Sequence, residues 1–136
     1  MTYLLDTNTS SDLMNSAQAS LTGWARAVSS GDDVCLSVVN VGEHLFGIER
    51  LGPGKRQDYY RQRLDEITAR LTVLDLPRDA VPIYGRIKAV TQARGRTIGD
   101  NDLWIASTAL SLGATLVTRD RDFDAVDGLR RADWSA

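Results

Sequence analysis

Apolar side chains divide the chain into short apolar runs separated by longer stretches with helical periodicity. Four runs are too short for buried helices and predict strands at residues 3–5, 34–37, 73–76 and 114–118, with a fifth strand near Leu129. The stretches between them predict one helix that starts near Asp6 and five more that cover residues 17–29, 38–48, 55–71, 79–93 and 102–112. Because strands alternate with helices, we expect an α/β protein with a mostly parallel sheet and helices on both faces.

The helix after the second strand carries its apolar residues on one stripe. Val38, Val41, Leu45 and Ile48 recur at helical spacing, and Ser37 is placed to cap the helix. This spacing predicts that the stripe is buried. Glu43 lies opposite the stripe, where solvent exposure is the default, although a residue that faces a site can also lie off the buried stripe.

Length and composition limit the class of protein. The chain has 136 residues, a net charge of -2 and one cysteine, which excludes an internal disulfide and a cysteine-rich zinc site. No apolar run approaches the roughly 20 residues that span a membrane, and the first residues do not resemble a signal peptide. We therefore expect a single cytoplasmic domain over residues 1–136. The near-neutral charge favours nucleic-acid binding only at a local site.

Acidic residues recur where predicted strands end and where the neighbouring helices begin. In a parallel α/β sheet, ligands bind beyond the carboxyl ends of the strands. Six acids stand at or near this edge: Asp6, Glu43, Asp100, Asp102, Asp120 and Asp122. The sequence therefore predicts a concentration of carboxylates where this fold places its site.

Each of these acids also has an ordinary structural explanation. Asp6 is placed to cap a helix. Asp100 and Asp102 lie in a first helical turn, where the helix dipole favours acids. Asp120 and Asp122 lie in a charged turn that is typical of a solvated loop.

The combination is more specific than any one acid. Two carboxylates about 4 Å apart repel by about 4 kcal/mol at an effective dielectric of 20, so several in one cleft must take up protons or bind a cation. Oxygen ligands favour Mg²⁺ or Mn²⁺, which can activate water at a phosphodiester. His44, the one histidine, is interpreted as structural.

Four motifs carry a family resemblance. They are LLDTN at residues 4–8, SVVNVGE at 37–43, IGDNDLWIA at 98–106 and LVTRDRDF at 116–123. In order and spacing they resemble the acidic motifs of the PIN-domain family and of the VapC-type toxins within it. The resemblance implies one PIN-like α/β/α sandwich of roughly five mostly parallel strands. It also implies an endoribonuclease that depends on Mg²⁺ or Mn²⁺.

The resemblance also assigns roles to residues. The Asp after Asn and the Asp two places after Thr are the family's acids, which selects Asp102 over Asp100 and Asp120 over Asp122. Asp6 and Asp102 are then the main metal ligands, and Glu43 and Asp120 complete the catalytic cluster. Hydrogen bonds to these carboxylates are expected from Thr7, Asn8 and Thr118. The roles of Asp100 and Asp122 stay open.

Partners are expected by the same analogy. Arg86, Arg94, Arg96 and Arg119 are candidates for RNA contact, with solvated helix ends or pairing to Asp as the alternative. VapC-type proteins are usually paired with a small VapB-like antitoxin, and the family commonly forms homodimers. The partner surfaces expected by analogy are the helices around residues 43–48 and 55–71. Phe46, Tyr59 and Tyr60 are the candidate anchors there, or else ordinary core or groove residues.

Two other functions compete with the ribonuclease. An Asp-based phosphatase or phosphotransfer domain would also place an Asp after the first strand. It needs a second Asp two residues later, where this chain has Asn8, and a lysine that neither Lys55 nor Lys88 is placed to supply. A binding module that keeps the fold without chemistry is the other alternative, and the presence of all four expected acids weighs against it.

Overall fold

The computed structural model of the chain describes residues 1–135. Its sheet contains five strands, all parallel, in the order β3-β2-β1-β4-β5. The strands are β1 (Thr2–Leu5), β2 (Asp33–Ser37), β3 (Thr72–Leu74), β4 (Thr115–Val117) and β5 (Arg131–Ala132). The sequence predicts a mostly parallel sheet of about five strands, and in the structure every pair of neighbouring strands is parallel.

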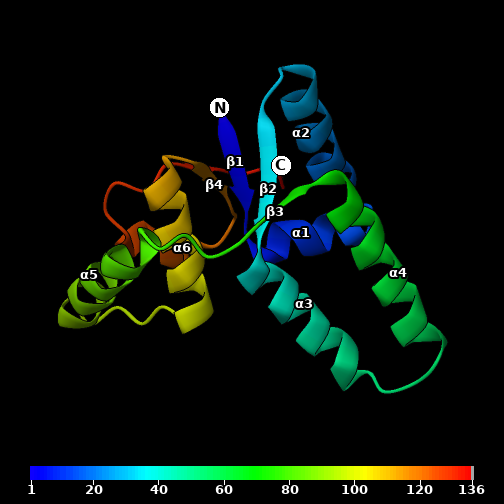
Figure 1. Ribbon diagram of the computed structural model, residues 1–136. Coiled ribbons are helices and arrows are strands. Elements are labelled where there is room, and N and C mark those ends of the chain that lie inside the picture. Colours follow the sequence, from blue (N-terminus) through cyan, green and yellow to red (C-terminus); the bar gives the residue numbers. More distant parts are fainter. Residues whose placement is uncertain (136) are drawn as a thin grey trace.

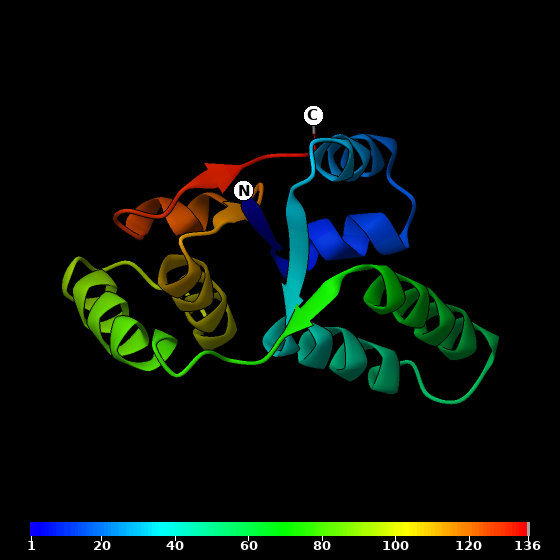
Figure 2. The same cartoon turned by 45° about the horizontal axis from the view of Figure 1, so that its top comes forward.

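Helices cover both faces of the sheet, as expected of an α/β/α sandwich (Figures 1 and 2). In chain order they are α1 (Thr7–Met14), α2 (Gln18–Ser29), α3 (Val38–Arg50), α4 (Lys55–Arg70), α5 (Ala80–Ala93) and α6 (Asp100–Leu112), followed by the short 3-10 helix η1 (Arg121–Ala125). Helices α5 and α6 lie on one side of the sheet, and α1, α2 and α4 lie on the other.

Strand side chains alternate between two hydrophobic cores. Leu4 and Leu116 belong to the core under α5 and α6, whereas their neighbours Leu5 and Val117 belong to the core under α1, α2 and α4. All four are fully buried. Successive strand residues point to opposite faces, so continuous apolar runs are what a sheet covered on both sides requires.

Most element boundaries differ from the sequence prediction by one to three residues. Strand β3 covers residues 72–74 rather than 73–76, and β5 covers residues 131–132 rather than lying at Leu129. Helix α6 starts at Asp100, two residues before the predicted start. Its predicted end is correct, because Gly113 adopts the left-handed conformation with φ of 63° that stops a helix.

The predicted buried stripe of α3 is only partly correct: Ile48 is buried and Val41 is half-buried, but the other two members are exposed. Val38 and Leu45 are 41% and 38% exposed, and the buried residues of the helix are Asn40, His44 and Ile48. Polar side chains occupy the buried row because each has a partner there. Asn40 forms a capping box with Ser37, and His44 Nε2 lies 2.6 Å from the hydroxyl of Ser10.

Within residues 1–135, no helix combines the length and the apolar character that crossing a membrane requires.

Candidate functional site

Asp6 lies at the carboxyl end of β1, where it caps α1. Its Oδ1 accepts a hydrogen bond of 2.7 Å from the backbone N–H of Thr9, which satisfies a free donor of the first helical turn. Its Oδ2 accepts a hydrogen bond of 2.5 Å from the hydroxyl of Thr118, at the end of β4. Only 3% of Asp6 is exposed. Asp6 can therefore cap α1 and also belong to a site at the edge of the sheet, because one oxygen caps the helix and the other faces the end of β4.

Thr118 connects Asp6 to the acid of the neighbouring strand. Its Oγ1 donates to Asp6 and accepts a hydrogen bond of 3.0 Å from the backbone N–H of Asp120. Asp120 Oδ1 in turn accepts the N–H of Asp122 at 2.9 Å and so caps η1. One buried threonine thus fixes the relative position of two carboxylates that are 114 residues apart in sequence.

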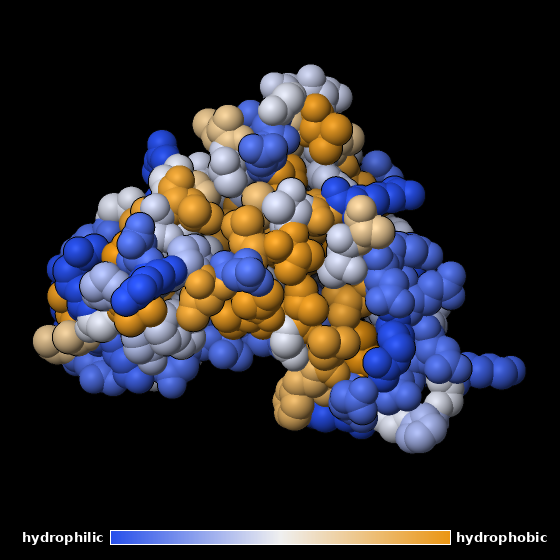
Figure 3. All heavy atoms as spheres, viewed as in Figure 1, coloured by the Kyte–Doolittle hydropathy of each residue, from blue (hydrophilic) through white to orange (hydrophobic). Residues whose placement is uncertain are grey.

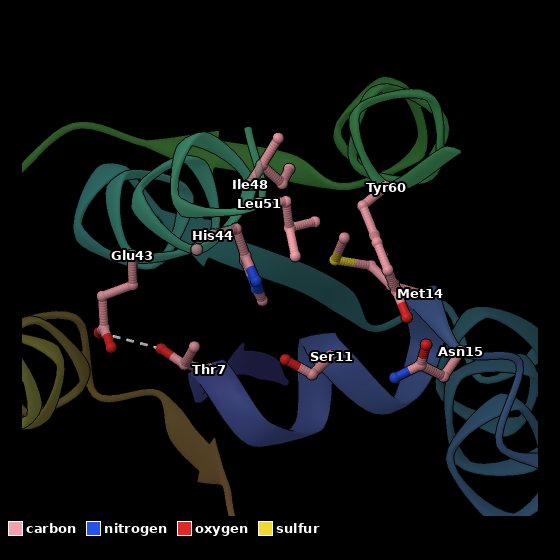
Figure 4. Close-up of a pocket in the computed structure, with 10 residues that line it drawn as sticks. Thr7, Ser11, Met14, Asn15, Glu43, His44, Ile48, Leu51 and Tyr60 are labelled. Atoms are coloured by element: carbon pink, nitrogen blue, oxygen red, sulfur yellow. Dashed lines mark hydrogen bonds between the residues drawn. The ribbon is translucent and has the colours of Figure 1, made fainter. Parts of the chain in front are cut away.

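Glu43 extends from α3 toward α1. Its Oε1 accepts a hydrogen bond of 3.0 Å from Thr7 Oγ1, and that oxygen accepts a bond of 3.2 Å from Asn40 Nδ2 (Figure 4). Burial raises the pKa of the Glu43 carboxyl, the Thr7 bond lowers it, and the charge of Asp6 raises it further. Glu43 is half-buried, and it faces the other acids rather than open solvent.

Asp102 is the acid whose pKa is affected by all the other acids of the site. Burial in the first turn of α6 and then the charges of four acids raise its pKa to about 6; in decreasing order they are Glu43, Asp120, Asp6 and Asp122. In residues 1–135, none of Asp6, Glu43, Asp102 and Asp120 forms an ion pair with a basic side chain. The four acids, here called the carboxylate cluster, therefore carry unbalanced negative charge at the carboxyl edge of the sheet.

The donor chemistry of the cluster fits a hard divalent cation. All its donors are carboxylate oxygens, and a cation would relieve the repulsion that raises the pKa of Asp102. As the side chains of residues 1–135 stand, no three His, Cys, Asp or Glu groups are arranged to hold an ion. Binding would therefore require the carboxylates to move together.

The two additional acids lie differently. Asp122 contributes the smallest of the charge effects on Asp102 and follows Asp120 in η1. Asp100 is turned toward α5, where it accepts hydrogen bonds of 2.9 Å from Lys88 Nζ and 3.0 Å from the Tyr84 hydroxyl. Asp100 is 64% exposed, and these bonds lower its pKa. Asp100 thus serves to hold α6 against α5.

The predicted supporting residues divide in the same way. Thr7 and Thr118 bond to the carboxylates as expected. Asn8 is exposed, and within residues 1–135 its side chain makes no hydrogen bond to a carboxylate. The backbone N–H of Thr9 takes the place that the motif suggested for Asn8.

The predicted basic residues are all exposed. Arg94 pairs with Asp127 at 2.8 Å, and Arg119 pairs with Asp12. Arg86 and Arg96 have no ion pair within residues 1–135. Two of the four arginines therefore already have the intramolecular partners that the alternative interpretation expects.

Two hollows open beside the cluster. One, of about 310 Å³, lies between α1, α3 and α4; His44, Ile48 and Tyr60 line it, and Glu43 stands at one end (Figure 4). Burial lowers the pKa of His44 and so favours the neutral ring, whose Nε2 forms the hydrogen bond with Ser10. The other hollow, of about 500 Å³, includes Glu43, Phe46 and Asn101 in its lining.

Comparison with known proteins identifies the family. The sequence model of the PIN domain matches residues 3–129. Ribonuclease VapC1 of Haemophilus influenzae (strain R2866) is 31% identical over 137 residues, or 99% of each chain. The tRNA(fMet)-specific endonuclease VapC of Shigella flexneri is 34% identical over 103 residues, or 75% of this chain and 76% of that protein.

A solved structure agrees with the sequence match. The chain superposes with a TM-score of 0.87 on the crystal structure of VapBC2 from Rickettsia felis bound to a DNA fragment from their promoter. The two chains are 27% identical, and the match covers 98% of this chain and 99% of that one. The protein therefore belongs to the PIN-domain family, and its relatives in that family are VapC ribonucleases.

Proposed function

We propose that the protein is an endoribonuclease that depends on Mg²⁺ or Mn²⁺ and acts as the toxin of a toxin–antitoxin pair, with residues 1–136 as its single catalytic domain. The observation that carries the proposal is the carboxylate cluster. Its four acids come from four separate segments, burial and the charges of the other acids raise the pKa of Asp102 to about 6, and no basic side chain of residues 1–135 forms an ion pair with any of the four. The names of the VapC relatives support RNA as the substrate.

We assign a part to each residue by analogy with the family. Asp6 and Asp102 are the main ligands for the cation, and Glu43 and Asp120 complete the set. A bound cation would supply a water of lowered pKa and neutralise charge that develops on the phosphate. Glu43 is a stronger base than an ordinary glutamate because its pKa is raised, which suits it to orient the attacking water and accept its proton.

The hydrogen bonds around the cluster hold these carboxylates in place. Thr118 fixes Asp6 relative to Asp120, and Thr7 fixes Glu43 relative to α1. Thr7 begins α1 and Thr118 directly follows β4, so both threonines restrict where these carboxylates stand before a cation draws them together.

An antitoxin is proposed to cover the hollow between α1, α3 and α4. This hollow begins at Glu43 and is mainly apolar toward Ile48, Leu51 and Tyr60, so a segment seated there would also block the cluster (Figure 4). The relative from R. felis was solved as VapBC2, which is consistent with such a partner. Tyr60 is half-buried in this hollow and is the candidate anchor.

A second copy of the chain is proposed to cover the apolar side of α3. Three apolar residues of α3 are exposed: Phe46, which is 64% exposed, and Val38 and Leu45. Figure 3 shows apolar side chains gathered across the middle of this face of the molecule. Tyr59, on α4, is 53% exposed. Phe46 and Tyr59 are therefore surface residues, and an interface is the proposed reason for their exposure.

The function can be tested with protein freed of antitoxin by denaturation and refolding. Labelled structured RNAs, including a tRNA, are incubated with Mg²⁺ or Mn²⁺ and separately with EDTA. We expect cleavage with the cation, no cleavage in EDTA, and recovery when the cation is returned. Equal cleavage in EDTA would refute the metal dependence. Binding of RNA without cleavage under every condition would favour the non-catalytic module.

A further inference from the structure

A polar cavity of about 370 Å³ adjoins the carboxylate cluster at Asp120. It lies between the segment after β4 and the segment that contains β5, and its lining includes Thr118, Arg121, Arg131 and Asp133. Its volume falls in the range of roughly 300–1,000 Å³ that is usual for small-molecule sites. The cavity is thus large enough for a ligand group, and one of its walls is an acid of the proposed active site.

The arginines of this cavity differ in how they are engaged. Arg131 pairs with Asp124, and Arg119 pairs with Asp12 outside the lining. Arg121 makes no hydrogen bond or ion pair in the part of the chain that the structure describes, so its five N–H donors are unused. The guanidinium available to a ligand is therefore that of Arg121.

The positive charge of Arg121 acts on the neighbouring groups of the cavity. The pKa of Asp124 is lowered, first by its bond to Arg131 and further by the charges of Arg121 and Arg96. Two of the three carboxylates of the lining are engaged, and the third, Asp120, belongs to the carboxylate cluster. Asp124 accepts from Arg131, and Asp133 accepts from the backbone and hydroxyl of Ser135.

We propose that this cavity binds an RNA backbone phosphate next to the one that is cleaved, with Arg121 as the residue that holds it. The proposal rests on the proposed function, because it needs RNA to pass the carboxylate cluster. Asp120 belongs both to the cluster and to the cavity lining, so a strand that is cleaved at the cluster places a neighbouring phosphate here. The planar guanidinium forms two parallel hydrogen bonds with phosphate oxygens, which fixes the position of the strand without reading its bases.

RNA binding in EDTA tests the phosphate site independently of cleavage. Dissociation constants for a short RNA that spans the cleaved bond are measured over a range of salt concentrations. For Arg121→Gln we expect binding about tenfold weaker, since a charge-assisted hydrogen bond is lost. We also expect the slope of log affinity against log salt to become shallower by about 0.7 to 1, because one phosphate contact disappears.

Two variants serve as controls. Arg70→Gln removes an equally exposed arginine at the opposite edge of the sheet, before β3, and should leave both quantities unchanged. Arg121→Lys keeps the charge but not the paired donors, so it should restore the salt slope and only part of the affinity. RNA with a neutral methylphosphonate at the contacted position should bind wild-type protein and Arg121→Gln equally well.

The outcomes separate the two proposals. If wild-type protein cleaves RNA but Arg121→Gln keeps its affinity and salt slope, the phosphate site is wrong and the function stands. If the methylphosphonate and Arg121→Gln weaken binding additively at every position tested, Arg121 does not contact the phosphate. If wild-type protein neither binds nor cleaves RNA, the proposed function fails and the phosphate site fails with it.

Discussion

Replacing Asp102 by Asn is expected to reduce the rate of RNA cleavage by about 10³-fold or more, because a proposed main ligand and its charge are removed from the cluster. Asp100→Asn, two residues earlier, is expected to change the rate by less than about threefold, since it loses only an exposed ion pair to Lys88. Single-turnover cleavage of one labelled RNA at saturating Mn²⁺ measures both rates.

The pair of variants is informative because the two residues share a helix turn and a chemistry. Asp102 is coupled to the other acids of the cluster, whereas Asp100 bonds to Lys88 and Tyr84 on α5. Equal losses in both variants would mean that the first turn of α6 matters only structurally. An active Asp102→Asn protein would remove Asp102 from the site.

In EDTA, Asp102→Asn is expected to be more stable than wild type at pH 7.5 by on the order of 2 kcal/mol. The folded pKa of Asp102 is about 6 against 3.8 for the ordinary group, so folding favours the protonated form. Its favourable contribution is complete below pH 3.8 and is lost as the pH rises through 6. The advantage of the variant should therefore shrink as the pH falls from 7.5 toward 5.

The comparison must be made between the two proteins rather than on wild type alone. His44 has a pKa below its ordinary 6.5, so protonation of the unfolded chain destabilises the fold as the pH falls through that value. This effect opposes that of Asp102 in the same pH range, and it is common to both proteins. Urea unfolding at each pH measures the difference. A difference that stays constant with pH would contradict the raised pKa of Asp102.

The strands could be predicted because burial on both faces leaves a clear local signal. The runs that contain Leu4-Leu5 and Leu116-Val117 are continuous and apolar since neighbouring residues enter different cores. Strand β5 was placed two to three residues early because a strand of two residues contributes almost no pattern. The order of the strands in the sheet could not be predicted, because it depends on pairing between segments that are far apart in the sequence.

The buried face of α3 could not be predicted from hydrophobicity. Its buried row contains Asn40 and His44, which are stable there because Ser37 and Ser10 provide hydrogen-bond partners. A pattern that equates burial with apolar residues selects Val38 and Leu45 instead, and these are the exposed ones. The partner of His44 is 34 residues away in sequence, so its contribution is invisible to a helical wheel.

The candidate site could also be predicted only in part from the sequence. The family resemblance selects Asp102 rather than Asp100, and the structure turns Asp100 toward α5 and couples Asp102 to the other acids. The motif suggested Asn8 as a supporting donor, but a backbone N–H fills that role. The cavity at Arg121 could not be predicted, because it forms only when β5 pairs beside β4.

Equilibrium binding of Mn²⁺ at pH 7.5 tests the central claim, that the carboxylate cluster holds a divalent cation, most directly. Free Mn²⁺ is measured by electron paramagnetic resonance during titration of wild-type, Asp100→Asn and Asp102→Asn proteins. We predict saturable binding to wild type and to Asp100→Asn, and binding about 100-fold weaker to Asp102→Asn because a ligand is missing. Equal binding to all three proteins, or no saturable binding to wild type, would contradict the claim.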